Sequence, residues 1–187
     1  NALGSFIKDA SLTFVMGHRY ADLDALGAAV AVCCIARSYG KRAHIVMSDQ
    51  PNACGVMIGE LKKVKEYEDI FVTPKEAMLL ANARSLLVVV DTNRPSYTDC
   101  PEILKMTKTI VVFDHHRQGS EVIENPVLSY IEPYASSACE MITEVLQYFS
   151  DKITVTAKEA DSQRFLRRGE YGVGKYFDAN IVRTWSR

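Results

Sequence analysis

The sequence predicts an α/β fold built on an open, mostly parallel sheet with helices on both faces. Short apolar runs alternate with longer amphipathic segments, which is the pattern of repeated strand–helix–strand units. The predicted strands at residues 85–90 and 109–113 each begin with a hydroxyl residue and then run apolar to their ends, as expected of strands that are covered on both faces. A length of 187 residues, of which 48% are hydrophobic, suits one domain with a sizeable core.

The first half of the predicted fold alternates clearly. A buried strand over residues 12–17 ends at a glycine, and a helix over residues 24–39 stops before Gly40. After these come a strand, a mixed segment with only a short helix, and a short strand, at residues 43–47, 51–68 and 70–72.

The second half continues the alternation up to residue 149. We expect a helix with proline at its first position, a strand, a helix and another strand, at residues 74–83, 85–90, 100–108 and 109–113. A shorter strand over residues 128–131 follows. Ser137 and Glu140 then form a predicted capping box at the start of a helix that runs through Phe149.

Composition excludes several functional classes. Lys and Arg number 22 against 23 Asp and Glu, so the chain lacks the basic excess of proteins that track long nucleic acids, although a small anionic ligand fits. The five cysteines form no CxxC pair, and we expect buried, reduced thiols suited to the cytosol. No apolar run approaches the roughly 18 residues of a membrane span, so we expect no direct membrane contact by this segment.

Acidic and histidine residues follow three of the predicted strands, in the segments GHRYADLDALG (residues 17–27), VDTNRPS (residues 90–96) and FDHHR (residues 113–117). Because the carboxyl ends of parallel strands meet at one edge of a sheet, these side chains should converge there. Clustered carboxylates favour a bound cation. Mixed carboxylate and imidazole ligands suit Mn²⁺, Mg²⁺, Fe²⁺ or Zn²⁺, and the lack of cysteines in these segments argues against a closed structural zinc site.

In this order and spacing, the three segments resemble the DHH phosphoesterase family, and most closely the DHH domain of the membrane-anchored cyclic-di-AMP phosphodiesterases of Gram-positive bacteria. The resemblance runs from about residue 5 to about residue 161 and includes IEPYASSACEMITEVLQ (residues 131–147). It implies two divalent metal ions, with manganese as the expected metal. His18, Asp22 and Asp91 would hold one ion, and Asp24, His115 and a bridging Asp91 the other.

The resemblance also implies roles near the substrate. His116 would contact the scissile phosphate as a catalytic residue, and Asp114 would support its neighbours. In an extended stretch His115 and His116 should point to different sides, which suits different roles. Four residues are candidates for substrate binding: Arg94 and Arg117 as phosphate contacts, and Ser136 and Ser137 through backbone N–H groups at a helix start.

The implied activity is hydrolysis of cyclic-di-AMP to the linear dinucleotide by attack of a hydroxide activated by two metals. Alternatives are a DHH nuclease of short oligonucleotides, an inorganic pyrophosphatase, or a catalytically silent nucleotide-binding module. The expected partner is the small nucleotide, with a homodimer as a further possibility. The implied location is a cytoplasmic domain of a membrane-anchored protein.

The sequence departs from the family after residue 161. The family's fourth motif, a strand of the form GIxxDT whose aspartate completes the second metal site, is missing, and SQRFLRR (residues 162–168) stands there instead. We expect the C-terminal lid domain of the family to be absent or incomplete in this sequence. We expect a DHH domain over residues 1–161 and an unassigned segment over residues 162–187. Either the strand is deleted, or this segment is a discontinuous remnant of a longer chain. The second interpretation is favoured, because losing a buried parallel strand would leave backbone groups unpaired.

Overall fold

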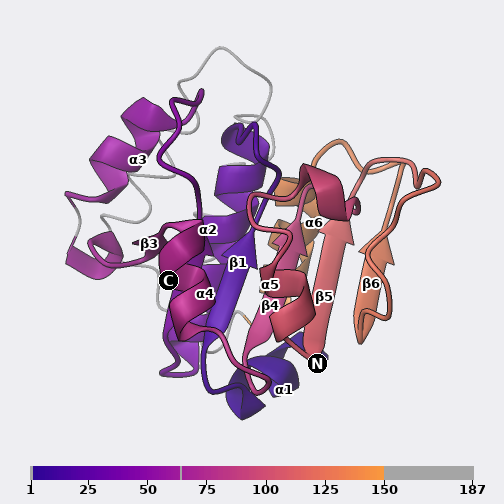
Figure 1. The fold of residues 1–187 in the computed structure, drawn as a ribbon, viewed down its shortest axis with the longest axis horizontal. Coiled ribbons are helices and arrows are strands. Elements are labelled where there is room, and N and C mark those ends of the chain that lie inside the picture. Colours follow the sequence, from indigo (N-terminus) through magenta and orange to yellow (C-terminus); the bar gives the residue numbers. More distant parts are fainter. Residues whose placement is uncertain (1, 64, 150–187) are drawn as a thin grey trace.

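The computed structural model describes residues 2–63 and 65–149 and confirms the predicted α/β sheet (Figure 1). Six strands lie in the order β3-β2-β1-β4-β5-β6, and every neighbouring pair is parallel. The strands are β1 (Thr13–Met16), β2 (Ala43–Val46), β3 (Phe71–Val72), β4 (Leu86–Val90), β5 (Thr109–Asp114) and β6 (Leu128–Ile131).

The strand order reverses at β1. This strand pairs with β2 on one side and with β4 on the other, so that Val15 lies opposite both Ile45 and Val88. In open parallel sheets, the crevice at the carboxyl ends of the strands on either side of such a reversal is where ligands bind. The loops that follow β1 and β4 therefore begin at the most favourable place for a site.

Helices cover both faces of the sheet. The first face packs against α1 (Ala2–Asp9), α2 (Leu23–Ser38) and α6 (Ala138–Gln147) through a core that includes Val15, Val88 and Val111. The opposite face, toward the viewer in Figure 1, packs against α4 (Pro74–Leu80) and α5 (Ile103–Met106) through Met16 and Val89. Alternate residues of β1 and β4 thus enter different cores, as the two-residue period of a strand requires.

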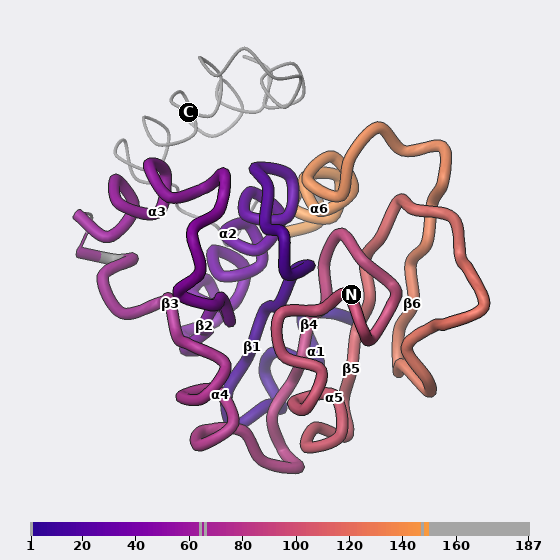
Figure 2. The backbone as a smooth tube through the Cα atoms, turned by 45° about the horizontal axis from the view of Figure 1, so that its top comes forward, coloured from indigo at the N-terminus to yellow at the C-terminus, as the bar shows by residue number. Residues whose placement is uncertain are grey.

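A smaller hydrophobic cluster lies beside α2. In it, Leu26 of α2 packs with Leu61 of α3 (Gly55–Leu61) and with Tyr67 of the short 3₁₀ segment Lys65–Tyr67. Figure 2 shows these segments and β3 on the opposite side of the sheet from β6. A second 3₁₀ turn, Pro95–Tyr97, follows β4 and belongs to the site described below. All five cysteines are free, and all but Cys34 are buried, as expected.

Three helices differ from the predictions. Helix α1 was not predicted from the sequence, and it buries Leu3 and Ile7 in the core. The helix predicted over residues 74–83 ends at Leu80, because Asn82 forms a local turn in which its side chain accepts the N–H of Arg84. The helix predicted over residues 100–108 shortens to α5, since the backbone is extended at Thr107.

The last predicted helix, α6, begins at its predicted position and ends at Gln147, two residues earlier than expected. The boundary predicted at residue 161 and the segment 162–187 lie outside the described residues. Among residues 2–63 and 65–149, no helix combines the length and the apolar character needed to cross a bilayer.

Candidate metal centre

The loops after β1, β4 and β5 meet at the carboxyl edge of the sheet, which confirms the predicted convergence. They surround one cleft of about 530 Å³. Its lining includes every predicted metal ligand and both predicted catalytic residues: His18, Asp22, Asp24, Asp91, Asp114, His115 and His116. Three segments that are separate in the sequence, residues 17–27, 90–96 and 113–117, thus contribute to a single site.

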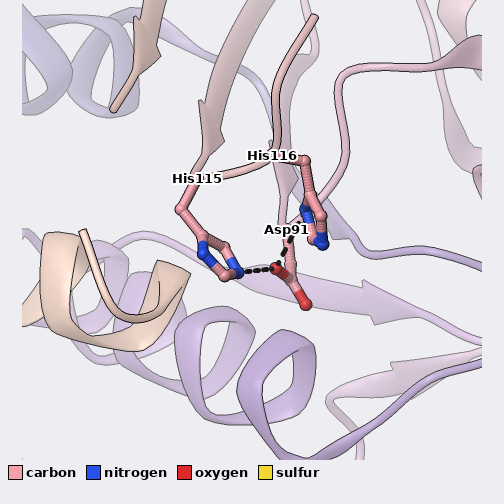
Figure 3. Close-up of side chains that lie close together, drawn as sticks. All are labelled: Asp91, His115 and His116. Atoms are coloured by element: carbon pink, nitrogen blue, oxygen red, sulfur yellow. Dashed lines mark ion pairs between the residues drawn. The ribbon is translucent and has the colours of Figure 1, made fainter. Parts of the chain in front are cut away.

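Asp91 lies at the centre of this cleft. It follows the last residue of β4 with φ of 59°, a conformation that Asp adopts more readily than most residues, and its N–H donates to the carbonyl of Phe113 at 2.9 Å. One carboxylate oxygen, Oδ2, lies 3.3 Å from Nε2 of His18. The other, Oδ1, lies 3.2 Å from Nε2 of His115 and 3.7 Å from Nδ1 of His116. Figure 3 shows both imidazoles directed at the Asp91 carboxylate.

The first donor set consists of His18, Asp22 and Asp91, whose ligand atoms lie close enough to hold one ion. Asp22 is the N-cap of α2, so that its Oδ1 accepts the N–H groups of Asp24 at 2.9 Å and Ala25 at 3.0 Å. Its Oδ2 lies 3.7 Å from Nε2 of His18. The helix cap therefore fixes one oxygen and leaves the other facing the cleft.

The second donor set also includes Asp91. Asp91, His115 and His116 have ligand atoms close enough for one ion, and Nε2 of His115 lies 3.5 Å from Oδ2 of Asp24. Asp24 is held from behind by the start of α6, where the N–H groups of Ala138 and Cys139 donate to its two oxygens at 2.9 and 2.7 Å. Asp24 and His116 thus both stand beside the Asp91–His115 pair.

The expectation that His115 and His116 point to different sides is wrong. Their ring centroids are 4.5 Å apart. The reason is that β5 ends at Asp114, so the two histidines lie beyond the strand and do not follow its alternation. They differ in exposure instead: the His115 side chain is 23% exposed and that of His116 is 59% exposed.

Asp114 has no exposed surface, and it contacts His116 twice. Its Oδ1 accepts the backbone N–H of His116 at 3.1 Å and lies 2.8 Å from Nδ1 of the ring. Its Oδ2 accepts a hydrogen bond from the side-chain amide of Asn93. Asn93 also donates to the carbonyl of His116 at 3.3 Å. No role was predicted for Asn93 from the sequence. Its position two residues after Asp91, in the same segment, is the feature that could have indicated a role in the site.

Electrostatics in the cleft favours a cation. The carboxylates of Asp22 and Asp91, 3.7 and 3.3 Å from Nε2 of His18, raise the pKa of His18 to about 10. Burial, together with the negative charge of Asp91, raises the pKa of Asp24 to about 6. Burial acts to raise the pKa of Asp22, but the nearby His18 imidazole and the hydrogen bond from the Ala25 N–H lower it overall. The raised pKa values of His18 and Asp24 are those expected where carboxylates crowd together and positive charge is stabilised.

The residues also pass a direct test of fit to a metal. The Asp91 Oδ1 atom is buried and has no hydrogen-bond partner among the described residues. A buried carboxylate oxygen without a partner is costly, and coordination of a cation is one way to satisfy it. Imidazole nitrogen and carboxylate oxygen together suit manganese and related divalent ions. The donor set thus fits the metal ions that the sequence predicts.

The four predicted substrate-binding residues lie in different surroundings. Arg94 lines the cleft, with its guanidinium 5.5 Å from the centroid of the Tyr97 ring. Arg117 is exposed and is not part of the cleft lining. Ser136 donates both its N–H and its hydroxyl to Glu140, and the Ser137 hydroxyl accepts the Glu140 N–H at 3.0 Å.

The anion contact predicted at this helix start through Ser136 and Ser137 stays a prediction, although several neighbouring N–H groups already have partners. Its next two N–H groups, those of Ala138 and Cys139, are taken by the Asp24 carboxylate, which occupies the favourable end of the helix dipole. The predicted capping box is half formed, because Glu140 turns to Ser136 and not to the N–H of Ser137. A complete capping box occurs instead at the start of α4, between Thr73 and Glu76.

Curated relatives share the sequence over most of this chain. It is 40% identical over 164 residues to the cyclic-di-AMP phosphodiesterase GdpP of Bacillus subtilis (strain 168), covering 86% of this chain and 25% of the relative. It is 40% identical over 166 residues to the cyclic-di-AMP phosphodiesterase PdeA of Listeria monocytogenes, covering 85% and 24%. A probable manganese-dependent inorganic pyrophosphatase of Streptococcus mutans is 28% identical over 130 residues, which is 68% of this chain and 39% of that protein. The chain spans about a quarter of the length of the first two relatives.

A solved structure shares the fold. An exopolyphosphatase-related protein from Bacteroides fragilis superposes with a TM-score of 0.67 at 15% identity, over 99% of this chain and 54% of that one. The family model described as the DHH family, N-terminal domain, matches residues 13–163. Because that match takes in all three donor-bearing loops and most of the 187 residues, this chain belongs to the DHH family.

Proposed function

We propose that this chain is a metal-dependent phosphodiesterase domain that hydrolyses cyclic-di-AMP to the linear dinucleotide. The observation that carries the proposal is the position of Asp91 between two donor sets, with one oxygen toward His18 and the other toward His115. One shared carboxylate between two cation sites is the arrangement used in two-metal phosphoryl chemistry. The similarity to the phosphodiesterases of B. subtilis and L. monocytogenes supports this substrate.

Two divalent ions, proposed to be manganese, would be held by the residues of the two donor sets. His18, Asp22 and Asp91 would hold the first. Asp91 and His115 would hold the second together with Asp24, whose Oδ2 lies 3.5 Å from Nε2 of His115, because Nδ1 of His116 is engaged by Asp114. When bound, such ions supply an activated water and neutralise negative charge on the phosphate. The side chains fix where this chemistry occurs, because Asp22 is held by the cap of α2 and Asp24 by the start of α6.

His116 is the proposed contact to the scissile phosphate. A carboxylate only accepts hydrogen bonds, so the close contact with Asp114 assigns the proton of the ring to Nδ1. Nε2 is then the nitrogen left to face the substrate. Asp114 acts through this ring and not on the substrate, since its own carboxylate is fully buried.

Inorganic pyrophosphate is the second candidate substrate, supported by the similarity to the streptococcal pyrophosphatase. The other functional hypotheses are a nuclease of short oligonucleotides and a catalytically silent nucleotide-binding module. The near-neutral charge of the chain disfavours a nuclease that tracks long strands.

Hydrolysis assays of the purified chain test the proposal. Cyclic-di-AMP, linear diadenylate and pyrophosphate would each be incubated with Mn²⁺ and with a chelator, and bound metal would be counted. We expect Mn²⁺-dependent turnover of cyclic-di-AMP. Turnover of pyrophosphate alone, or metal binding without turnover of any substrate, would contradict the proposal. The cytoplasmic, membrane-anchored location and the homodimer stay predictions.

A further inference from the structure

One wall of the cleft carries two tyrosines next to the first donor set. His18 and Thr98 pair as an antiparallel bridge, and the N–H of Arg19 donates to the carbonyl of Tyr97 at 2.8 Å. The two segments 18–20 and 95–98 therefore run side by side. Tyr20 and Tyr97 both line the cleft and are 70% and 46% exposed.

Each of these tyrosines is accompanied by an arginine. The Arg94 guanidinium lies 5.5 Å from the centroid of the Tyr97 ring, and that of Arg19 lies 5.9 Å from the centroid of Tyr20. Single exposed tyrosines are common on protein surfaces. Two such pairs on one wall, beside a set of metal donors, form a surface of planar groups that suits a planar ligand.

The Arg94–Tyr97 pair is the better supported of the two. The Arg94 guanidinium lies against Gly119, where a Cβ atom would come within 3.2 Å of Nη2. The segment around Gly119 is held to the loop after β4 by Glu121. The Glu121 carboxylate accepts the N–H of Ser96 at 2.8 Å and the Ser96 hydroxyl at 2.6 Å. Arg94 is thus confined between Gly119 and Tyr97, while Tyr97 lines the cleft and is 46% exposed overall.

We propose that Tyr97, backed by Arg94, is the stacking platform for one adenine base of the substrate. This inference rests on the proposed function, which supplies the dinucleotide, and adds how its base is recognised. Bases stack on aromatic rings and arginine planes, and each stacked base contributes substantially to binding. The first donor set adjoins the platform through the His18–Thr98 bridge, so a phosphate near the metals places its nucleoside within reach of this wall.

Two small ligands isolate the contribution of the base: adenosine 5′-monophosphate and ribose 5-phosphate, which lacks the base. Both would be titrated by calorimetry into the Mn²⁺-loaded chain. We expect the wild type to bind the adenosine ligand more tightly. Tyr97→Leu should weaken adenosine monophosphate about 10-fold, in the range of one lost base–aromatic stack, and leave ribose 5-phosphate unchanged.

Two further variants serve as controls. Tyr97→Phe keeps the ring and should bind as the wild type does. Tyr148→Leu removes an equally apolar ring from an 81% exposed position outside the cleft lining and should have no effect. Equal weakening of both ligands in Tyr97→Leu, no weakening of either, or equal affinity of the wild type for both would overturn the inference. The cyclic-di-AMP assay reports on the proposed function separately, because these titrations need no turnover.

Discussion

The Nδ1 atom of His116 lies 2.8 Å from a carboxylate oxygen of Asp114, a residue with no exposed surface. The same oxygen accepts the backbone N–H of His116 at 3.1 Å, so both the main chain and the ring of the histidine are fixed by one buried group. A buried carboxylate behind a histidine sets the tautomer and orientation of the ring, and such supporting groups influence activity without touching the substrate.

Replacing Asp114 by Asn should therefore reduce catalysis more than metal binding. The amide oxygen is a weaker acceptor than the carboxylate, and the ring of His116 is held less firmly. We expect kcat for cyclic-di-AMP to fall by about 10- to 100-fold while the Mn²⁺ content is retained. The measurement is the rate at saturating substrate together with metal analysis of the same sample. Glu144→Gln, at an exposed position of α6, is the matched control. An unchanged kcat in Asp114→Asn would show that the ring needs no support.

Asp91→Asn tests the shared carboxylate. Asn tolerates the φ of 59° as well as Asp does, so the backbone should keep its shape while the charge is lost. For the wild type we expect Mn²⁺ to raise the free energy of unfolding by about 2.7 kcal/mol at 100 times the dissociation constant. The variant should gain far less and show no turnover. Thermal unfolding with and without Mn²⁺ measures both proteins, and an equal gain would place the metals away from Asp91.

The fold was largely predictable from the sequence, because buried parallel strands consist of continuous runs of apolar residues. Strands β4 and β5 were identified almost to the residue. Helix α1 was not predicted, and the burial of Leu3 and Ile7 against distant residues is not visible in its short sequence. The shortened helices α4 and α5 have a related cause: Asn82 and Thr107 stop them through local conformations that helical periodicity does not record.

The residues that form the site were predictable from the sequence, but the way they are arranged was less so. The three loops could be placed at one edge because parallel strands share a direction. The contact of Asp24 with the start of α6 could not be predicted, because Asp24 is separated from Ala138 and Cys139 by more than 110 positions in the sequence. The proximity of the two histidine rings was likewise hidden, because it depends on where β5 ends.

The stability of the metal-free protein should depend on pH through His18. Its contacts with the carboxylates of Asp22 and Asp91 raise the folded-state pKa to about 10, above the ordinary value of 6.5. A group whose folded pKa is raised stabilises the fold fully below the unfolded pKa, and this contribution is lost as pH rises toward the folded pKa. We therefore expect the free energy of unfolding to fall by about 2–4 kcal/mol between pH 6.5 and pH 10 in the presence of chelator.

Urea denaturation across this pH range measures the effect. His18→Gln should flatten the profile, because the variant has no proton to lose at this position. Saturating Mn²⁺ should also remove the decline, since metal binding requires the deprotonated imidazole and is favoured as pH rises. A variant with the same slope as the wild type would assign the decline to other groups.

The two donor sets should differ in metal occupancy. The first combines His18, Asp22 and Asp91, and the free oxygen of Asp22 faces the cleft. The second relies on Asp24, whose two oxygens already accept the N–H groups of Ala138 and Cys139 and are weaker donors for that reason. The fourth aspartate implied by the family resemblance has no counterpart in the cleft lining among residues 2–63 and 65–149. Because the Asp24 oxygens are already engaged by Ala138 and Cys139, the first set should be fuller at limiting Mn²⁺. Anomalous scattering at the manganese edge from crystals grown at substoichiometric metal measures the two occupancies directly. Two equally strong peaks, with no aspartate other than Asp24 and Asp91 at the second, would refute this ranking.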